Sequence, residues 1–271
     1  MSYGQPVTDL HLDVPGARIA YSVHEGAAPT RVVAHGLTSS RAADDAGGFM
    51  PWAGLDTSAR TVRYDARGHG DSTGRTVPDD WTWNHLADDL LALLDQVSPD
   101  EPVDALGASM GAATILWAAI RRPERFRRLV LVIPPTAWET RAAVGDDYRA
   151  GADLIERDGI AAWLDPAANE PQLALLTAAG FEDSAPPHIA DALVPSVFRG
   201  AAMSDLPAPD AIATIAAPTL LLPWAGDPGH PVSTSEKLLG LLPDARLQVA
   251  ETPEQLRAWP NVIEEFLGEL A

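Results

Sequence analysis

Short apolar runs alternate with amphipathic stretches along most of this chain. Four runs rich in Val, Leu and Ile are typical of buried parallel strands: 31–34, 61–64, 103–106 and 128–133. Apolar residues recur at helical spacing over 83–97 and 112–121, on either side of the run at 103–106. This alternation predicts an α/β fold in which helices flank a mostly parallel sheet.

Both ends of the chain add to the predicted sheet. Segments 7–13 and 18–23 are separated by Pro15 and Gly16, a pattern that predicts an antiparallel hairpin. The C-terminal part contributes two further strands and two helices: 218–223, 233–242, 245–250 and 253–270. The expected sheet therefore has eight strands.

The segment 136–206 interrupts this alternation. It lacks strand-like runs and carries helical patterns, for example at 148–156 and 171–179. We expect it to form a helical lid inserted into a core made of residues 1–135 and 207–271. A chain of 271 residues with a hydrophobic fraction of 46% can build one such α/β domain with a substantial core.

Charge and composition exclude several classes of function. A net charge of −19 repels nucleic-acid phosphates and anionic membrane surfaces, and no uninterrupted apolar run reaches the ~20 residues of a membrane span. The absence of cysteine rules out disulfides, thiolate catalysis and cysteine-bound zinc. With no segment resembling a signal peptide, we expect a cytoplasmic protein. Abundant Ala and Pro, with Lys237 the only lysine, resemble the coding bias of a GC-rich bacterium.

Residues 107–111 (GASMG) carry the most specific chemical signal. They follow the predicted strand 103–106 and precede the helical stretch 112–121, the context that a GxSxG nucleophile elbow requires. The sharp turn would expose the Ser109 hydroxyl as a nucleophile, and the Met110 N–H at the helix start could stabilise an oxyanion. A chance match in an Ala- and Gly-rich chain is the alternative.

Two more motifs lie after predicted strands, at 32–37 (VVAHGL) and 64–72 (YDARGHGDS). Together with the 107–111 elbow they resemble the α/β-hydrolase superfamily over nearly the whole chain, most closely its lid-bearing esterases and 3-oxoadipate enol-lactone hydrolases. The resemblance implies that the Leu37 N–H completes an oxyanion hole with Met110. It also implies that the 64–72 loop mainly braces its surroundings, so Asp65 and His69 are expected to be structural rather than catalytic.

The catalytic triad of this family is only partly recognisable. The resemblance implies a carboxylate four residues before a proline after the penultimate strand, a place that Asp227 occupies; the same aspartate could instead cap a turn. The usual histidine follows the last strand, but residues 247–255 (LQVAETPEQ) contain none, and no histidine occurs after His230.

His230 is the best substitute for the missing base. In Asp227-Pro228-Gly229-His230, Pro and Gly occupy the central positions of a type II turn, which would bring Asp227 and His230 within ~7 Å. The carboxylate could then orient the imidazole toward Ser109. A surface histidine beside a vestigial acid is the competing interpretation. The chain's other histidines are His11, His24, His35, His69, His85 and His188. Of these, His11, His24 and His85 are expected to be structural, and His188, in the lid segment, could at most touch substrate.

The sequence thus favours a serine hydrolase that cleaves a small ester, lactone or related carbonyl bond through an acyl-enzyme on Ser109, without metal or organic cofactor. A small-molecule substrate would lie near the aromatic candidates Trp138 and Trp163. Three arginines could offset the negative field for a carboxylate-bearing substrate: Arg141, Arg149 and Arg199. The rival functions are a non-catalytic binding protein and a cofactor-free lyase, cyclase or isomerase that uses the oxyanion hole without acylation.

Overall fold

One eight-stranded sheet forms the centre of the computed structural model, which describes residues 9–47, 50–164, 174–181 and 187–269. The strands are β1 (Asp9–Val14), β2 (Ala17–His24), β3 (Ala27–Ala34), β4 (Ala59–Tyr64), β5 (Val103–Ala108), β6 (Phe126–Val132), β7 (Thr219–Leu222) and β8 (Ala245–Leu247). Their order is β1-β2-β4-β3-β5-β6-β7-β8. β2 pairs antiparallel with β1 and β4, and every other neighbouring pair is parallel. The eight strands and mostly parallel pairing predicted from the sequence are confirmed.

Helices connect the parallel strands. In the core they are α1 (Arg41–Gly47), η1 (Pro51–Gly54), η2 (Pro78–Trp81), α2 (Trp83–Val97), α3 (Met110–Arg121), η3 (Pro123–Arg125), α8 (Pro209–Ile212), α9 (Val232–Leu241), α10 (Pro253–Arg257) and α11 (Trp259–Gly268). Between β6 and α8 lie η4 (Trp138–Thr140), α4 (Arg141–Asp158), α5 (Ile160–Trp163), α6 (Ala174–Ala179) and α7 (Val194–Ala202). Of the helices in the described ranges, none combines the length and apolar composition that crossing a membrane requires.

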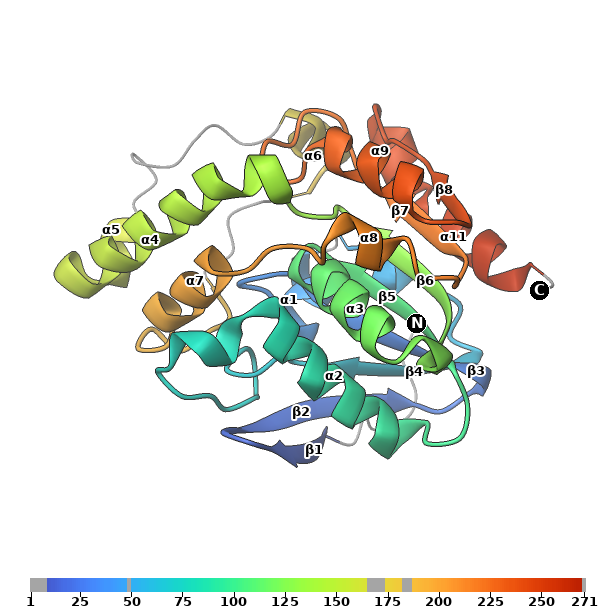
Figure 1. Cartoon of the computed structure of the whole chain (residues 1–271), viewed down its shortest axis with the longest axis horizontal. Helices are drawn as coiled ribbons and strands as arrows, with labels where there is room; N and C mark the ends of the chain where they lie inside the picture. Colours follow the sequence, from blue (N-terminus) through green and yellow to red (C-terminus); the bar gives the residue numbers. More distant parts are fainter. Residues whose placement is uncertain (1–8, 48–49, 165–173, 182–186, 270–271) are drawn as a thin grey trace.

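The two faces of the sheet are both buried. In β6, Leu129 belongs to the apolar cluster shared with α2 and α3, whereas the next residue, Val130, belongs to the cluster shared with α11. Successive side chains of a strand point to opposite faces, so a strand covered on both sides is apolar at consecutive positions. Figure 1 shows α2 and α3 lying across one face. The continuous apolar runs in the sequence follow from this double burial.

Helices joined by loops make up the described part of the segment between β6 and α8. It holds no strand in those residues, only an isolated bridge between Ile189 and His69. Ile155 of α4 and Phe198 of α7 share a third apolar cluster with Trp81 of η2. Figure 1 shows α4, α5 and α7 extending beyond the sheet on one side. Because the segment starts at the carboxyl end of β6, it lies on the side of the sheet where β5 also ends.

Three local expectations differ from the structure. The closing helix predicted over 253–270 is two helices, α10 and α11, because Pro260 in the first turn of α11 has no N–H to continue the hydrogen-bond ladder of α10. The strand predicted over 245–250 ends at Leu247, and pairing resumes only as a bridge between Ala250 and Trp224. Helix α1 lacks a clear apolar period and was not predicted. Residues 171–173 of a predicted helix and 7–8 of the first strand lie outside the described residues.

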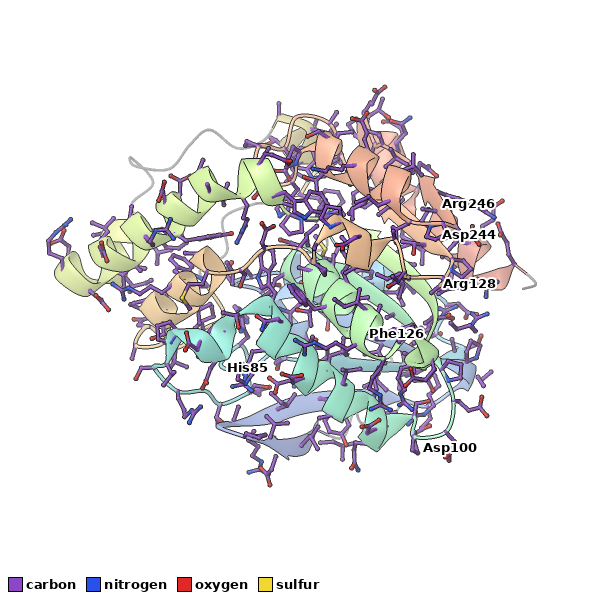
Figure 2. All side chains as sticks on the ribbon, viewed as in Figure 1. His85, Asp100, Phe126, Arg128, Asp244 and Arg246 are labelled. Atoms are coloured by element: carbon purple, nitrogen blue, oxygen red, sulfur yellow. The ribbon has the colours of Figure 1, made fainter. Side chains whose placement is uncertain are left out.

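The last strand and last helix are joined to the core by a cluster around Phe266. The guanidinium groups of Arg128 and Arg246 lie 6.0 Å and 5.8 Å from the centre of the Phe266 ring. Figure 2 shows both arginines near the C-terminal end of the chain. Arg246 also pairs with Glu269, so cation–π and ionic contacts hold α11 against the sheet.

Candidate active site

Ser109 lies in the tight turn between β5 and α3. Its φ of 50° and ψ of −110° are strained for a residue with a side chain, and its N–H donates to the carbonyl of Val132 on the neighbouring strand at 3.0 Å. A Cβ on Gly107 would lie 2.6 Å from the carbonyl carbon of Gly111, and a Cβ on Gly111 would lie 2.2 Å from the carbonyl oxygen of Ala34. Only glycine fits at these two positions, which is why the turn needs GxSxG.

The Ser109 hydroxyl begins a continuous hydrogen-bonded chain. Its Oγ lies 2.8 Å from Nε2 of His230, and Nδ1 of the same ring lies 2.7 Å from Oδ2 of Asp227. Since a carboxylate can only accept, Nδ1 carries the ring proton and donates to Asp227, which leaves Nε2 free to accept from the Ser109 hydroxyl. The structure therefore brings together all three side chains that the sequence singled out.

The loop that carries Asp227 and His230 differs from the expected type II turn. Gly229 does not adopt the positive φ that such a turn needs; in this loop Gly226, with φ 89°, does. Oδ1 of Asp227 instead accepts the N–H groups of Gly229 at 2.9 Å and His230 at 3.1 Å. The turn prediction was wrong because the aspartate side chain, rather than a backbone carbonyl, satisfies these amides.

The pKa of Asp227 is lowered from its ordinary value. Burial by itself raises that pKa, but the hydrogen bond from His230, the charge of its imidazolium form and the two backbone N–H donors outweigh this effect. Only 8% of Asp227 is exposed, so water screens these contacts weakly. The carboxylate is consequently ionised at neutral pH, as required of a group that stabilises an imidazolium.

The two amides predicted to bind an oxyanion lie at the ends of neighbouring strands. Leu37 follows β3 and Met110 begins α3, and a Cβ placed on Gly36 would lie 3.6 Å from Cβ of Ser109. No hydrogen bond within the described residues uses the N–H of Leu37, and the Met110 N–H, in the first turn of a helix, has no intrahelical acceptor. Both amides are therefore without an acceptor in the described part of the structure, near Ser109.

The 64–72 loop is held by buried hydrogen bonds. Asp65 accepts from the backbone N–H of Arg41 at 2.8 Å and from its guanidinium at 3.1 Å. His35 accepts the N–H of Ala66 through Nε2 at 2.9 Å, which ties this loop to the end of β3. His69 is fully buried, and burial, with the nearby His35, lowers its pKa to about 3. These contacts brace the loop and give none of the three side chains a bond to Ser109.

The two aromatic residues suggested as substrate contacts have structural partners. Trp138 donates its Nε1–H to the carbonyl of Pro207 at 3.1 Å, and the ammonium of Lys237 lies 4.5 Å from its ring centre. Trp163 packs edge-on against Phe198, with ring centres 5.2 Å apart. Neither ring has a recorded contact with Ser109 in the described part of the structure.

The three candidate arginines are also engaged elsewhere. Arg141 is buried, donates to the carbonyls of Ala201 and Ser204, and lies 4.2 Å over the Trp83 ring. Arg149 of α4 and Arg199 of α7 are both ion-paired at the surface with carboxylates of α4. The expectation that one of them serves a substrate carboxylate therefore gains no support from their contacts.

Sequence reasoning missed two contacts that hold the site together. The N–H of Thr136 donates to the carbonyl of Gly229 at 3.1 Å, which joins the loops after β6 and β7. The N–H of His188 donates to the carbonyl of Thr38 at 2.8 Å, next to Leu37. No local pattern indicates either pairing, because the partners lie roughly 90 and 150 residues apart, far beyond the reach of turn or helix periodicity. Among the described residues, no group of His, Asp or Glu side chains is arranged to hold a metal ion.

The fold agrees with the comparisons to known proteins. Residues 32–252 match the α/β hydrolase fold family, so the chain belongs to that family. It is 29% identical over 222 residues to 3-oxoadipate enol-lactonase 2 of Acinetobacter baylyi, covering 76% of this chain and 78% of the relative.

Solved structures extend the likeness to nearly the full length. A hydrolase from Pseudomonas aeruginosa aligns with a TM-score of 0.73 at 26% identity, covering 96% of this chain and 98% of the other. The enol-lactonase from Burkholderia xenovorans aligns with a TM-score of 0.77 at 22% identity, covering 96% and 100%, a likeness that shows the fold alone.

Proposed function

We propose that this protein is a serine hydrolase that opens a small ester or lactone through an acyl-enzyme on Ser109. The observation that carries the proposal is the unbroken chain from Ser109 Oγ to His230 Nε2 at 2.8 Å and from His230 Nδ1 to Asp227 Oδ2 at 2.7 Å. A hydroxyl needs an adjacent base to become a nucleophile, and the base needs a third group that fixes its tautomer. In this proposal His230, from the loop after β7 that also carries Asp227, replaces the histidine usually found after the last strand.

The reaction follows from this geometry. Ser109 Oγ bonds to the carbonyl carbon as its proton passes to His230 Nε2, and the negative charge that develops on the carbonyl oxygen is held by the N–H groups of Leu37 and Met110. The carbonyl re-forms as the bond to the alkoxy oxygen breaks, and that oxygen takes the proton from His230. Water then repeats both steps at the acyl carbon, which releases the acid and restores the Ser109 hydroxyl.

The relatives support the choice of substrate class. The chain shares its family and most of its length with a protein named as an enol-lactonase, whose substrate is a cyclic ester. A lactone needs no separate leaving-group site, because its alcohol stays attached to the acyl chain. In the same proposal, the helical segment 136–206 acts as a lid over the carboxyl ends of β5 and β6.

Covalent labelling tests the proposal directly. A fluorophosphonate probe should modify wild-type protein at Ser109, and Ser109→Ala should abolish both labelling and hydrolysis of short p-nitrophenyl esters. His230→Ala should slow labelling by a factor of about 10² to 10⁴, the usual contribution of a general base. His11→Ala, which changes an exposed histidine of β1, is the matched control and should behave as wild type.

The outcomes separate the competing functions. A wild-type protein that resists labelling but binds lactones would be a binding protein or an enzyme that does not acylate its serine. Unchanged labelling in His230→Ala would remove His230 as the base and, with it, the proposed mechanism.

A further inference from the structure

The loop that follows β3, residues 36–40, is held in a strained conformation. Thr38 has a φ of 65°, in the left-handed region that a β-branched residue rarely enters. Such a conformation persists only where surrounding contacts over-determine it. Thr38 follows Leu37 directly, so the contacts that hold Thr38 also hold the chain immediately after Leu37.

Contacts inside the loop are local. The Thr38 hydroxyl donates to the carbonyl of Leu37 at 2.6 Å, and the N–H of Ser39 donates to the carbonyl of Gly36 at 3.2 Å. Both close small rings within the loop. They shape the turn without fixing its place relative to Ser109.

His188 supplies a contact from outside the loop at two points. Its backbone N–H donates to the carbonyl of Thr38 at 2.8 Å, and its Nδ1 lies 2.8 Å from Oγ of Ser40. Ser40 Oγ also accepts the N–H of Ala43 at 3.0 Å. Among the described residues His188 Nδ1 is the acceptor within reach of the Ser40 hydroxyl hydrogen, so we assign the hydroxyl as the donor in this bond. Ser40 is fully buried in the presence of the imidazole, so its hydroxyl depends on His188 for this acceptor.

The far side of His188 is anchored as well. Its carbonyl accepts the N–H of Gly70 at 2.7 Å, and the adjacent Ile189 forms a bridge with His69. The residue thus connects the helical segment, the 64–72 loop and the loop of Thr38. A link fixed at three points can hold strained backbone in place.

We infer that His188 is a positioning residue that holds the Leu37 N–H in the oxyanion hole, an inference that rests on the proposed function. Loss of its imidazole removes the acceptor of the Ser40 hydroxyl and loosens the loop of residues 36–40, which shifts the Leu37 amide relative to Ser109. Oxyanion donors act on the transition state more than on bound substrate. The expected effect is therefore a lower kcat at nearly constant KM.

Two near-isosteric substitutions separate positioning from simple packing. The amide oxygen of Asn in His188→Asn can take the place of Nδ1 and accept from Ser40, whereas the amide of Gln in His188→Gln extends toward the place of Nε2. Removing one oxyanion donor costs about 10² to 10³ in kcat, and a displaced donor is expected to cost at least about tenfold. His188→Gln should show this loss and His188→Asn should retain most of the wild-type kcat.

His24→Gln is the control, because it makes the same His-to-Gln change at a histidine that does not contact the loop of Thr38. His24 and His188 line the same surface cavity of about 710 Å³, but the His24 ring bonds to the carbonyl of Thr57, away from the loop of Thr38. Its kcat should equal that of wild type. Ser40→Ala removes the same bond from the other partner and should show a loss like that of His188→Gln, with little further loss when the two are combined.

The affinity for a trifluoromethyl ketone distinguishes the two roles, because it should stay unchanged if His188 only stabilises the fold. This probe forms a tetrahedral oxyanion on Ser109, so its affinity should fall in proportion to kcat/KM across the variants while Tm stays near wild type. A folded His188→Gln with wild-type kcat and ketone affinity overturns the inference, as does an equal loss in His188→Asn. If His188→Gln does not fold, Ser40→Ala decides by the same two criteria. If Ser109→Ala has the same hydrolytic activity as the wild-type protein, that result contradicts the proposed function rather than the role of His188.

Discussion

Replacing Asp227 by asparagine tests whether this carboxylate orients the base or only caps its loop. Oδ1 accepts two backbone N–H groups, from Gly229 and His230, and Oδ2 accepts the proton of the His230 ring at 2.7 Å. In Asp227→Asn, the amide oxygen can keep the position of Oδ1 and both backbone bonds. The amide nitrogen then stands where Oδ2 stood and donates to Nδ1.

This reversal of the hydrogen bond at Nδ1 stabilises the wrong tautomer of His230. With Nδ1 as an acceptor, the ring proton moves to Nε2, which lies 2.8 Å from Ser109 Oγ and can no longer accept its proton. The analogous change in a well-known serine protease lowers kcat by about 10⁴ with the geometry intact. The expected loss here is of the same order, about 5.5 kcal/mol in transition-state free energy.

The assay compares the rate of fluorophosphonate labelling and kcat for a short p-nitrophenyl ester between pH 5 and 8. Because the pKa of Asp227 is already lowered, the wild-type carboxylate stays ionised throughout this range, so its protonation cannot mask the comparison. Asp227→Ala is the second variant, and it should lose the loop bonds as well as the activity. An Asp227→Asn variant with more than a tenth of wild-type kcat would refute the tautomer argument and leave Asp227 as a turn cap.

Three further predictions concern stability. His69 has a pKa lowered to about 3, so as pH falls the unfolded imidazole, near 6.5, binds its proton first; acidification from pH 7 to 5 should cost about 2 kcal/mol of unfolding free energy in urea titrations. His69→Gln should lack that loss, whereas His11→Gln should keep it. Gly111→Ala places a methyl 2.2 Å from a backbone oxygen and should lower Tm, with a cost of about 1–3 kcal/mol or a failure to fold. Ser109→Gly relieves the strain of a residue with φ 50°, so it should raise the free energy of unfolding by about 1 kcal/mol and increase Tm. A lower Tm would contradict the idea that this backbone is strained.

The sequence by itself determined the fold and located the tight turn that carries Ser109, because the signals for both are local. Apolar runs of strand length predicted the eight strands, and β5, Ser109 and α3 lie within one short segment. Its Gly107 is required by the nearby Gly111, whereas Gly111 is required by the carbonyl of Ala34 on the neighbouring strand β3. The family resemblance rested on the same kind of local motif. Local geometry was less reliable where a side chain replaced a backbone partner, as Asp227 did at the expected type II turn.

Only the tertiary structure decided which residues meet Ser109 and its neighbours. His230 and Ser109 are 121 positions apart, and their contact exists because parallel strands bring their carboxyl ends to one edge of the sheet. The pairing of His188 with Ser40 spans 148 positions and depends on how a helical segment folds back over that edge. Periodicity and turn chemistry report on neighbours within a few residues, whereas such long-range contacts are selected by the packing of the whole chain.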